Sequence, residues 1–334
     1  MLIKTAVLPD AEAAQCWQQW RDAYNVEECS WPQHKLLVLI SERLVRIAPE
    51  SPEIRHIEGL AKANWTKSKL RLHHAGAAID QLSAAGIDVL LLKGAVSEAL
   101  SESHDRRRVT SDLDMMVRRK HLKATFDVLA RLGLTCGKDA NAAYKRCRSH
   151  PGVNIVSACQ GIDVDIHHQP VHFPFLPDMV LDRIWRDARA ANFFNRQVLI
   201  PSECDHLAFT VVQGMRRFVP SHLTSGLWAV DLARWAAQAD PDWPGLLKST
   251  ASVRGSLALY AGLCYVRDEL HAEIPESVFD RLLEERFSME QFLSFFAQAP
   301  SIGVVGKMAL PLREVVLLLT QQMFHRSARN NMAR

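Results

Sequence analysis

Two aspartates stand two residues apart where a polar segment leads into a short apolar one, in Ser111-Asp112-Leu113-Asp114. Side chains alternate across a β-strand, so Asp112 and Asp114 are expected on the same face. Two carboxylates held that close repel each other and favour a cation between them. Mg²⁺ takes oxygen ligands, often one or two carboxylates together with substrate phosphates. The pair therefore has the geometry that a two-ion Mg²⁺ site needs, in which one ion holds a triphosphate and the other activates an attacking hydroxyl.

A third aspartate lies in a second alternating segment, Ile162-Asp163-Val164-Asp165-Ile166-His167. An Asp-x-Asp pair alone is a weak signal, because a strand often begins with solvated carboxylates. A further carboxylate on a strand that returns beside the first would complete a site for two ions. Asp163 and Asp165 share one face, so alternation favours neither of them. His167 is interpreted either as a partner that orients a carboxylate or as a packed strand histidine.

A phosphate-binding junction is predicted upstream of the aspartate pair. The segment Ile87 to Leu92 is apolar and partly β-branched, which predicts a buried strand, and it ends at Lys93-Gly94. A short helix is expected from Ala95 to Leu100. A glycine at this junction lets backbone N–H groups approach a phosphate, whose charge the helix N-terminus favours. Arg108, just before the aspartate pair, can hold triphosphate oxygens with two hydrogen bonds at once.

Helical spacing dominates the remaining sequence. Apolar residues recur at helical intervals from Leu36 to Ile47, and a second helix is expected from Lys67 to Ala85, where Gly86 stops it. Between the two aspartate segments and around them, we expect a strand over 113–117, a helix over 122–132 capped by Gly133, and a hairpin of 153–158 with 162–166. From Asp178 to the end mostly amphipathic helices are expected, the clearest over 203–218, 221–239, 255–270 and 310–324. Trp228 and Trp235, seven residues apart, are expected in the core.

These elements predict an α+β fold, in which a small mixed sheet with helices is flanked by helical segments. We expect an N-terminal helical arm over residues 1–66, a central core over residues 67–170 and a helical C-terminal domain over residues 178–334.

Several segments together resemble the bacterial nucleotidyltransferase-like proteins of the DNA polymerase β superfamily that carry a Lys-Gly signature. In that family an apolar strand ends in Lys-Gly, an Arg precedes an Asp-x-Asp strand, and an Asp-hydrophobic-His strand follows. Here these features are Leu90 to Gly94, Arg108 to Asp114 and Val164 to His167. A family helix with a Trp and an Asp-Leu-Ala is similar to Leu227 to Ala233. The resemblance covers roughly residues Ser83 to Ala239.

The resemblance implies a polymerase β-type nucleotidyltransferase core that moves a nucleoside monophosphate from a Mg²⁺-bound NTP to an acceptor and releases pyrophosphate. It implies catalytic and metal-binding roles for three aspartates, Asp112, Asp114 and Asp165, and it selects Asp165 over Asp163. Contacts with the NTP are expected from Lys93, Gly94, Arg108 and Ser111. Lys93-Gly94 stands where the wider superfamily usually has Gly-Ser, and Gln213-Gly214 stands where the family often has His-Gly.

The acceptor is left open among a small molecule, a sugar, a peptide and a protein. Nucleic acid is not favoured, because the net charge is only +3 and the sequence shows no pattern of basic and aromatic residues. The alternative function is a non-catalytic module that binds a nucleotide or a partner with the same fold. Seven cysteines without a CxxC pair indicate reduced thiols, and no apolar run is long enough to cross a bilayer. We therefore expect a cytoplasmic protein without a signal peptide and without a membrane partner.

Overall fold

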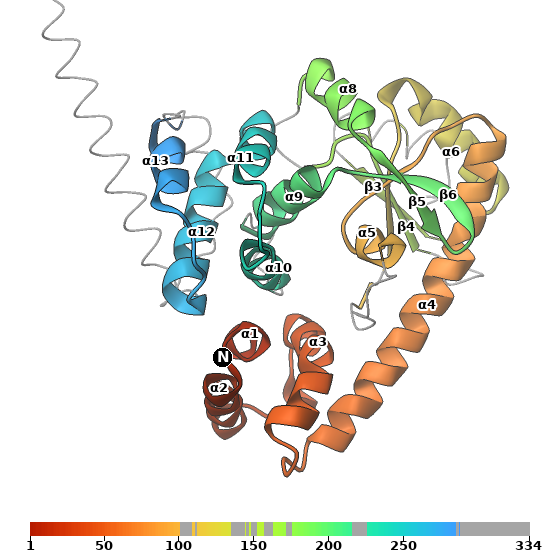
Figure 1. The fold of residues 1–334 in the computed structure, drawn as a ribbon. Helices are drawn as coiled ribbons and strands as arrows, with labels where there is room; N and C mark the ends of the chain where they lie inside the picture. The colour runs from red at the N-terminus through yellow and green to blue at the C-terminus, as the bar shows by residue number, and fades with distance from the viewer. Residues whose placement is uncertain are drawn as a thin grey trace, which may run out of the picture.

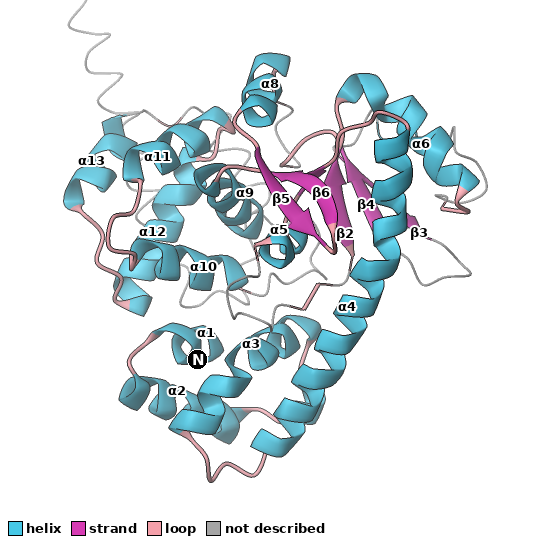
Figure 2. Ribbon diagram, turned by 45° about the vertical axis from the view of Figure 1, so that its right-hand side comes forward, coloured by secondary structure: helices cyan, strands magenta, loops and turns pink. Residues whose placement is uncertain are grey.

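The computed structural model of the protein describes residues 1–100, 109–110, 112–134, 144, 147, 152–156, 163–171, 176–215, 226–284 and 287. A mixed sheet lies beside two groups of helices, and the N-terminal helices form a third group next to the C-terminal ones (Figure 1). Figure 2 shows that helices cover both faces of the sheet. The α+β fold expected from the sequence is confirmed. Among the helices that the structure describes, none is both long enough and apolar enough to cross a membrane.

The sheet has six strands in the order β3-β4-β2-β1-β6-β5. Their bounds are β1 Leu90–Leu91, β2 Leu113–Met116, β3 Gly152–Val156, β4 Asp163–His167, β5 Arg189–Phe193 and β6 Arg196–Ile200. Strands β2 and β4 are parallel, as are β1 and β6, and the other neighbours are antiparallel. The strands predicted around 87–92 and 113–117 are present but shorter, and the predicted antiparallel pairing of β3 with β4 is confirmed.

Helices predominate among the described residues from 178 onward, as expected, but the hairpin of β5 and β6 was not predicted. It joins the sheet because β6 pairs with β1. Its two-residue loop, Phe194-Asn195, has φ values of 48° and 64° at its two positions. Such loops usually contain glycine, and none is present here. Strand β5 is also largely exposed, so the sequence shows no apolar alternation that would predict it.

Two helices cover one face of the sheet: α4 Ile54–Ala84 and α6 Leu122–Arg131. Gly86 and Gly133 follow these helices with φ values of 69° and 73°, which confirms both predicted helix ends. The start predicted for the first helix, Lys67, is wrong, because α4 is a single helix of 31 residues. Its first turns bury Ile54 and Ile57 in the core of the N-terminal helices, and that packing extends the helix.

The opposite face of the sheet packs on the C-terminal helices. These are α8 Asp178–Arg186, α9 Glu203–Met215, α10 Leu227–Ala236, α11 Trp243–Ser252, α12 Ser256–Leu270 and α13 Glu276–Glu284. Leu90, Leu92 and Met116 from the sheet enter the same apolar core as these helices. Trp228 and Trp235 are buried in this core, as predicted. The helix expected over 310–324 lies outside the described residues.

The N-terminal helices pack against the C-terminal group. They are α1 Leu2–Val7, α2 Asp10–Ala23 and α3 Trp31–Ile47, with the short 3₁₀ turn η1 Val26–Glu28 between α2 and α3. A second such turn, η2 Arg119–His121, precedes α6. The core of the N-terminal helices, which includes Trp17 and Leu37, also contains Val230 of α10. Helix α1 contacts both α10 and α12. The beginning of the chain is therefore held against its second half, close to α10.

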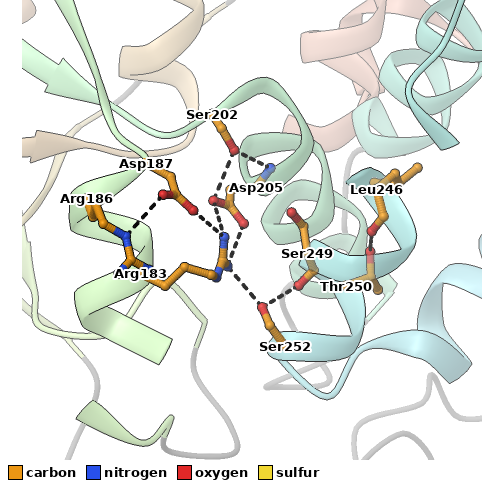
Figure 3. Close-up of polar contacts among 9 residues, drawn as sticks. All are labelled: Arg183, Arg186, Asp187, Ser202, Asp205, Leu246, Ser249, Thr250 and Ser252. Atoms are coloured by element: carbon orange, nitrogen blue, oxygen red, sulfur yellow. Dashed lines mark hydrogen bonds and ion pairs between the residues drawn. The ribbon is translucent and has the colours of Figure 1, made fainter. Parts of the chain in front are cut away.

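A buried ion pair ties three C-terminal helices together (Figure 3). Arg183 of α8 donates two hydrogen bonds to the fully buried Asp205 of α9, at 2.8 and 3.0 Å. The Ser202 hydroxyl donates to the same carboxylate at 3.0 Å, and Arg183 also donates to Ser252 of α11 at 3.0 Å. Because Asp205 has several partners, its burial is compensated, and α9 is fixed beside the sheet.

Candidate active site

Strands β2 and β4 place two of the predicted aspartates side by side. The two strands are parallel, and their register pairs Asp114 with Asp165 and Met116 with His167. Paired residues on neighbouring strands project from the same face of a sheet. The Asp114 side chain is 3% exposed and the Asp165 side chain 17%. The structure therefore brings together two carboxylates that lie far apart in the sequence.

His167 contacts both carboxylates. Its Nε2 lies 3.0 Å from Oδ1 of Asp114 and 3.0 Å from Oδ2 of Asp165. Burial of the imidazole and the nearby charge of Lys93 lower the pKa of His167, but hydrogen bonds and charge from the two aspartates outweigh them and raise that pKa. The contacts favour the interpretation of His167 as a histidine that orients carboxylates, even though it is also packed within the sheet.

Lys93 brings a positive charge to the same carboxylates. Its Nζ donates a hydrogen bond to Oδ1 of Asp114 and lies 3.7 Å from Oδ2 of Asp165. Burial acts to lower the pKa of Lys93, but the two aspartates outweigh it and raise that pKa above its ordinary value. Lys93 is therefore a fully charged ammonium at neutral pH, directed toward the carboxylate pair.

The turn that carries Lys93 has an unusual backbone. Lys93 immediately precedes helix α5 Gly94–Ala99, with φ 50° and ψ −130°. A residue other than glycine in such a conformation costs about 1–3 kcal/mol, and the surrounding structure must compensate for it. At the next position, a Cβ on Gly94 would lie 2.6 Å from Oγ1 of Thr110. The turn thus needs glycine at position 94 for close approach, while it holds a lysine in a strained conformation at position 93.

A pocket of about 220 Å³ opens beside this turn. One side is formed by Lys93, Gly94, Asp112 and Asp114. The predicted junction and the predicted aspartate pair therefore face one cavity, and Asp165 lies 3.7 Å from Lys93 of the cavity wall. The charged wall suits the phosphates of a nucleotide next to a metal ion.

The other side of the pocket comes from helices. His206, Thr210 and Gln213 of α9 line it, and Lys35 reaches it from α3. The α9 residues are spaced by four and three positions, so they lie on one helical face. This polar face on an otherwise apolar helix is visible in the sequence, but its residues were not among the predicted site residues. Lys35 stands within an apolar helical run, and nothing in its local pattern predicts the contact.

Other predicted residues lie elsewhere. Arg108 and Ser111 lie outside the described residues. Asp163, at the start of β4, accepts a hydrogen bond from Nδ2 of Asn154 at 2.5 Å. Within the described part of the chain, the group of potential metal ligands comprises Asp114, Asp165 and His167, whose ligand atoms lie within 4.8 Å of one another. Two carboxylates and an imidazole at this spacing form a donor set that fits a divalent cation.

Comparison with known proteins agrees with this geometry. A family model described as "Uncharacterised nucleotidyltransferase" matches residues 30–271, which is well over half of the chain. The chain belongs to this nucleotidyltransferase family. The matched segment begins at the start of α3 and ends after α12, so it contains the residues of both pocket walls. The nucleotidyltransferase resemblance drawn from the sequence motifs is thereby confirmed.

Two further comparisons concern curated proteins and solved structures. No curated protein matches this nucleotidyltransferase. Among solved structures, it is similar to MenT4, a nucleotidyltransferase toxin from Mycobacterium tuberculosis H37Rv, with 13% sequence identity and a TM-score of 0.31. That similarity covers 84% of this chain and 89% of the other.

Proposed function

We propose that this nucleotidyltransferase transfers a nucleoside monophosphate from an NTP, bound with Mg²⁺, to a hydroxyl group of an acceptor. The observation that carries the proposal is the contact cluster of Asp114, Asp165 and His167 beside a pocket whose wall includes Asp112. When bound, two Mg²⁺ ions would neutralise the triphosphate and favour ionisation of the attacking hydroxyl. The protein's own residues provide the ligands, the position of the nucleotide and a base.

In the proposed reaction, the acceptor oxygen forms a bond to the α-phosphorus of the NTP. The bond between that phosphorus and the oxygen bridging to the β-phosphate breaks, and pyrophosphate leaves with the electron pair. Asp112 and Asp114 would hold the cations, while Asp165 would hold a cation and accept the proton of the hydroxyl. The partial exposure of Asp165 supports this role, because a base must be accessible to the acceptor.

The triphosphate is assigned to the wall around the Lys93-Gly94 turn. Lys93 supplies an ammonium, and Gly94 exposes backbone because it lacks a side chain. Arg108 and Ser111 keep the NTP contacts proposed from the sequence. The acceptor side is assigned to α9, whose polar face lies across the pocket.

We retain the division into an arm (1–66), a catalytic core (67–170) and a helical domain (178–334) as a division of function. Helix α4 crosses the first boundary, so arm and core are one continuous body at that point. The acceptor is a small molecule, a sugar, a peptide or a protein, and nucleic acid is not favoured. The cytoplasm stays the predicted compartment, on the basis of the cysteine pattern.

The test is incubation of the protein with a cell extract, Mg²⁺ and each of the four NTPs labelled in the α-phosphate. We expect pyrophosphate release and a labelled acceptor, identified by mass spectrometry, and neither with an Asp112→Asn variant that folds normally. NTP binding that depends on Mg²⁺ but gives no pyrophosphate release over a broad acceptor panel would instead establish the non-catalytic binding module.

A further inference from the structure

The ammonium of Lys93 occupies the point where the metal-binding carboxylates converge. It bonds Oδ1 of Asp114, the oxygen that His167 also contacts at 3.0 Å. It lies 3.7 Å from Oδ2 of Asp165, the other oxygen within reach of His167. These two oxygens belong to the group of atoms that would bind a divalent cation. A positive charge is thus already present where the ion would bind.

We propose that Lys93 is the resident counter-cation of this metal centre, and that a divalent ion and an NTP enter together because the ammonium must leave the carboxylates. This inference rests on the proposed function, since it concerns how the same site is loaded. It adds a role that phosphate binding alone does not require. In the nucleotide-free protein Lys93 opposes the metal, and in the loaded protein it supports the triphosphate.

Electrostatics gives the reason for coupling the two events. An ammonium and a divalent ion that share one carboxylate oxygen repel each other strongly in a partly buried site. The Lys93 side chain also lines the pocket, and its flexible four-carbon stem allows the ammonium to turn toward it. A triphosphate bound there offers a new anionic partner. Without the nucleotide, Asp114 and Asp165 are the carboxylates that hold the ammonium.

The backbone conformation supports a dedicated role for this side chain. Glycine adopts φ 50° and ψ −130° without the steric cost that a Cβ imposes, yet the position holds lysine. A strained residue at a functional site persists when its side chain serves the site. Lys69 is a useful contrast, because it also forms a partly buried pair, with Glu98 of α5, but away from the carboxylate cluster.

The experiment measures Mn²⁺ binding to the full chain by electron paramagnetic resonance, with and without the non-hydrolysable α,β-methylene analogue of each of the four NTPs in turn. Without nucleotide, Lys93→Met should bind Mn²⁺ about tenfold more tightly than wild type, which is within the usual range of coupling between sites. Lys93→Gly should also bind Mn²⁺ about tenfold more tightly than wild type. Glycine adopts the backbone conformation at position 93 without strain, so this second uncharged variant is expected to preserve the turn. Lys69→Met, the matched control, should keep wild-type affinity. At least one nucleotide analogue should tighten Mn²⁺ binding in wild type by a larger factor than in Lys93→Met.

Two negative results have different meanings. If wild type binds Mn²⁺ with at least one analogue, but neither uncharged variant binds it more tightly without an analogue, the role of Lys93 as counter-cation is overturned and the proposed function stands. If wild type binds no Mn²⁺ with any of the analogues, the proposed metal-dependent function fails, and the inference fails with it.

Discussion

Asp114 is buried, whereas Asp112 and Asp165 are partly exposed. A buried carboxylate must have charged or hydrogen-bonding partners to offset its lost hydration, and Lys93 and His167 supply them. Replacement of Asp114 would remove a hydrogen-bond partner from both Lys93 and His167, so its effects on folding and on chemistry would be mixed. Asp165 is more exposed, and it gives the cleaner test of the chemistry at the level of single residues.

The first prediction compares Asp165→Asn with Asp163→Asn. Asp165→Asn should lower pyrophosphate release by about 100-fold or more, because it removes a charge from the metal site, yet it should still bind NTP. Asp163→Asn should be much milder, since the Asp163 carboxylate contacts Asn154 at the start of β4. The measurement is pyrophosphate release at saturating Mg²⁺. An inactive Asp163→Asn beside an active Asp165→Asn would show that the third carboxylate has been assigned to the wrong residue.

At the scale of elements, the turn between β1 and α5 depends on tight contact with the segment before β2. The backbone N–H of Leu92 donates to the carbonyl oxygen of Asp114 at 3.0 Å, and that of Thr110 donates to Ser68 of α4 at 3.2 Å. Gly94 lies against the Thr110 side chain with no room for a Cβ. The turn between β1 and α5, the segment before β2 and helix α4 therefore contact one another beside the pocket.

The second prediction concerns that contact. Gly94→Ala should lower the free energy of unfolding by about 1–3 kcal/mol, the usual cost of overpacking. Thr110→Ala removes the two atoms nearest to the new methyl group, so the double variant should recover part of the loss. Urea unfolding of the two single variants and the double variant tests this. Additive losses would mean that Gly94 and Thr110 are not in the contact that the structure shows.

The third prediction concerns the ion pair between α8 and α9. Arg183→Met leaves the Asp205 carboxylate buried without its main partner, which should cost about 3–5 kcal/mol of folding free energy. Arg267 and Asp268 form a more exposed pair, and Arg267→Met should cost about 1 kcal/mol or less. Thermal or urea unfolding compares the two variants. Equal losses would contradict a special role for the buried pair in holding α9.

At the scale of the whole molecule, the pocket draws its walls from distant parts of the chain. The sheet supplies Asp114, the C-terminal helix α9 supplies Thr210, and the N-terminal helix α3 supplies Lys35. Val230 of α10 is buried among the N-terminal helices, so α3 is held in place by the second half of the chain. The N-terminal helices therefore contribute Lys35 to the pocket wall as well as packing into the fold.

The fourth prediction tests that contribution. Lys35→Ala should lower kcat/KM for pyrophosphate release, because it removes a cation from the pocket wall, while stability should change by about 0.5 kcal/mol or less. Lys4, which pairs with Glu269 away from the pocket, gives the control variant Lys4→Ala with unchanged kinetics. If a folded Lys35→Ala protein has the kcat/KM of wild type, α3 does not contribute to the site through Lys35.

Local patterns in the sequence are sufficient for the parts of the site that lie within one short segment. Alternation places Asp112 and Asp114 on one face, and the junction of an apolar strand with Lys93-Gly94 predicts the turn beside the pocket. Helical spacing and Gly86 or Gly133 mark helix ends correctly, because helix formation and its termination are short-range effects. The family resemblance also rests on such segments, and its motifs were enough to identify a nucleotidyltransferase.

The tertiary structure was needed wherever partners are distant in the chain. Alternation left Asp163 and Asp165 equivalent, and only the parallel register of β4 on β2 brings Asp165 beside Asp114. Likewise, β5 and β6 have an atypical loop and an exposed strand, so their place in the sheet depends on long-range pairing with β1. The contact of Lys93 with the carboxylates and the approach of Lys35 have the same origin. The periodicity of the sequence predicts on which face of an element a side chain lies. Strand register and packing determine which residues that face contacts.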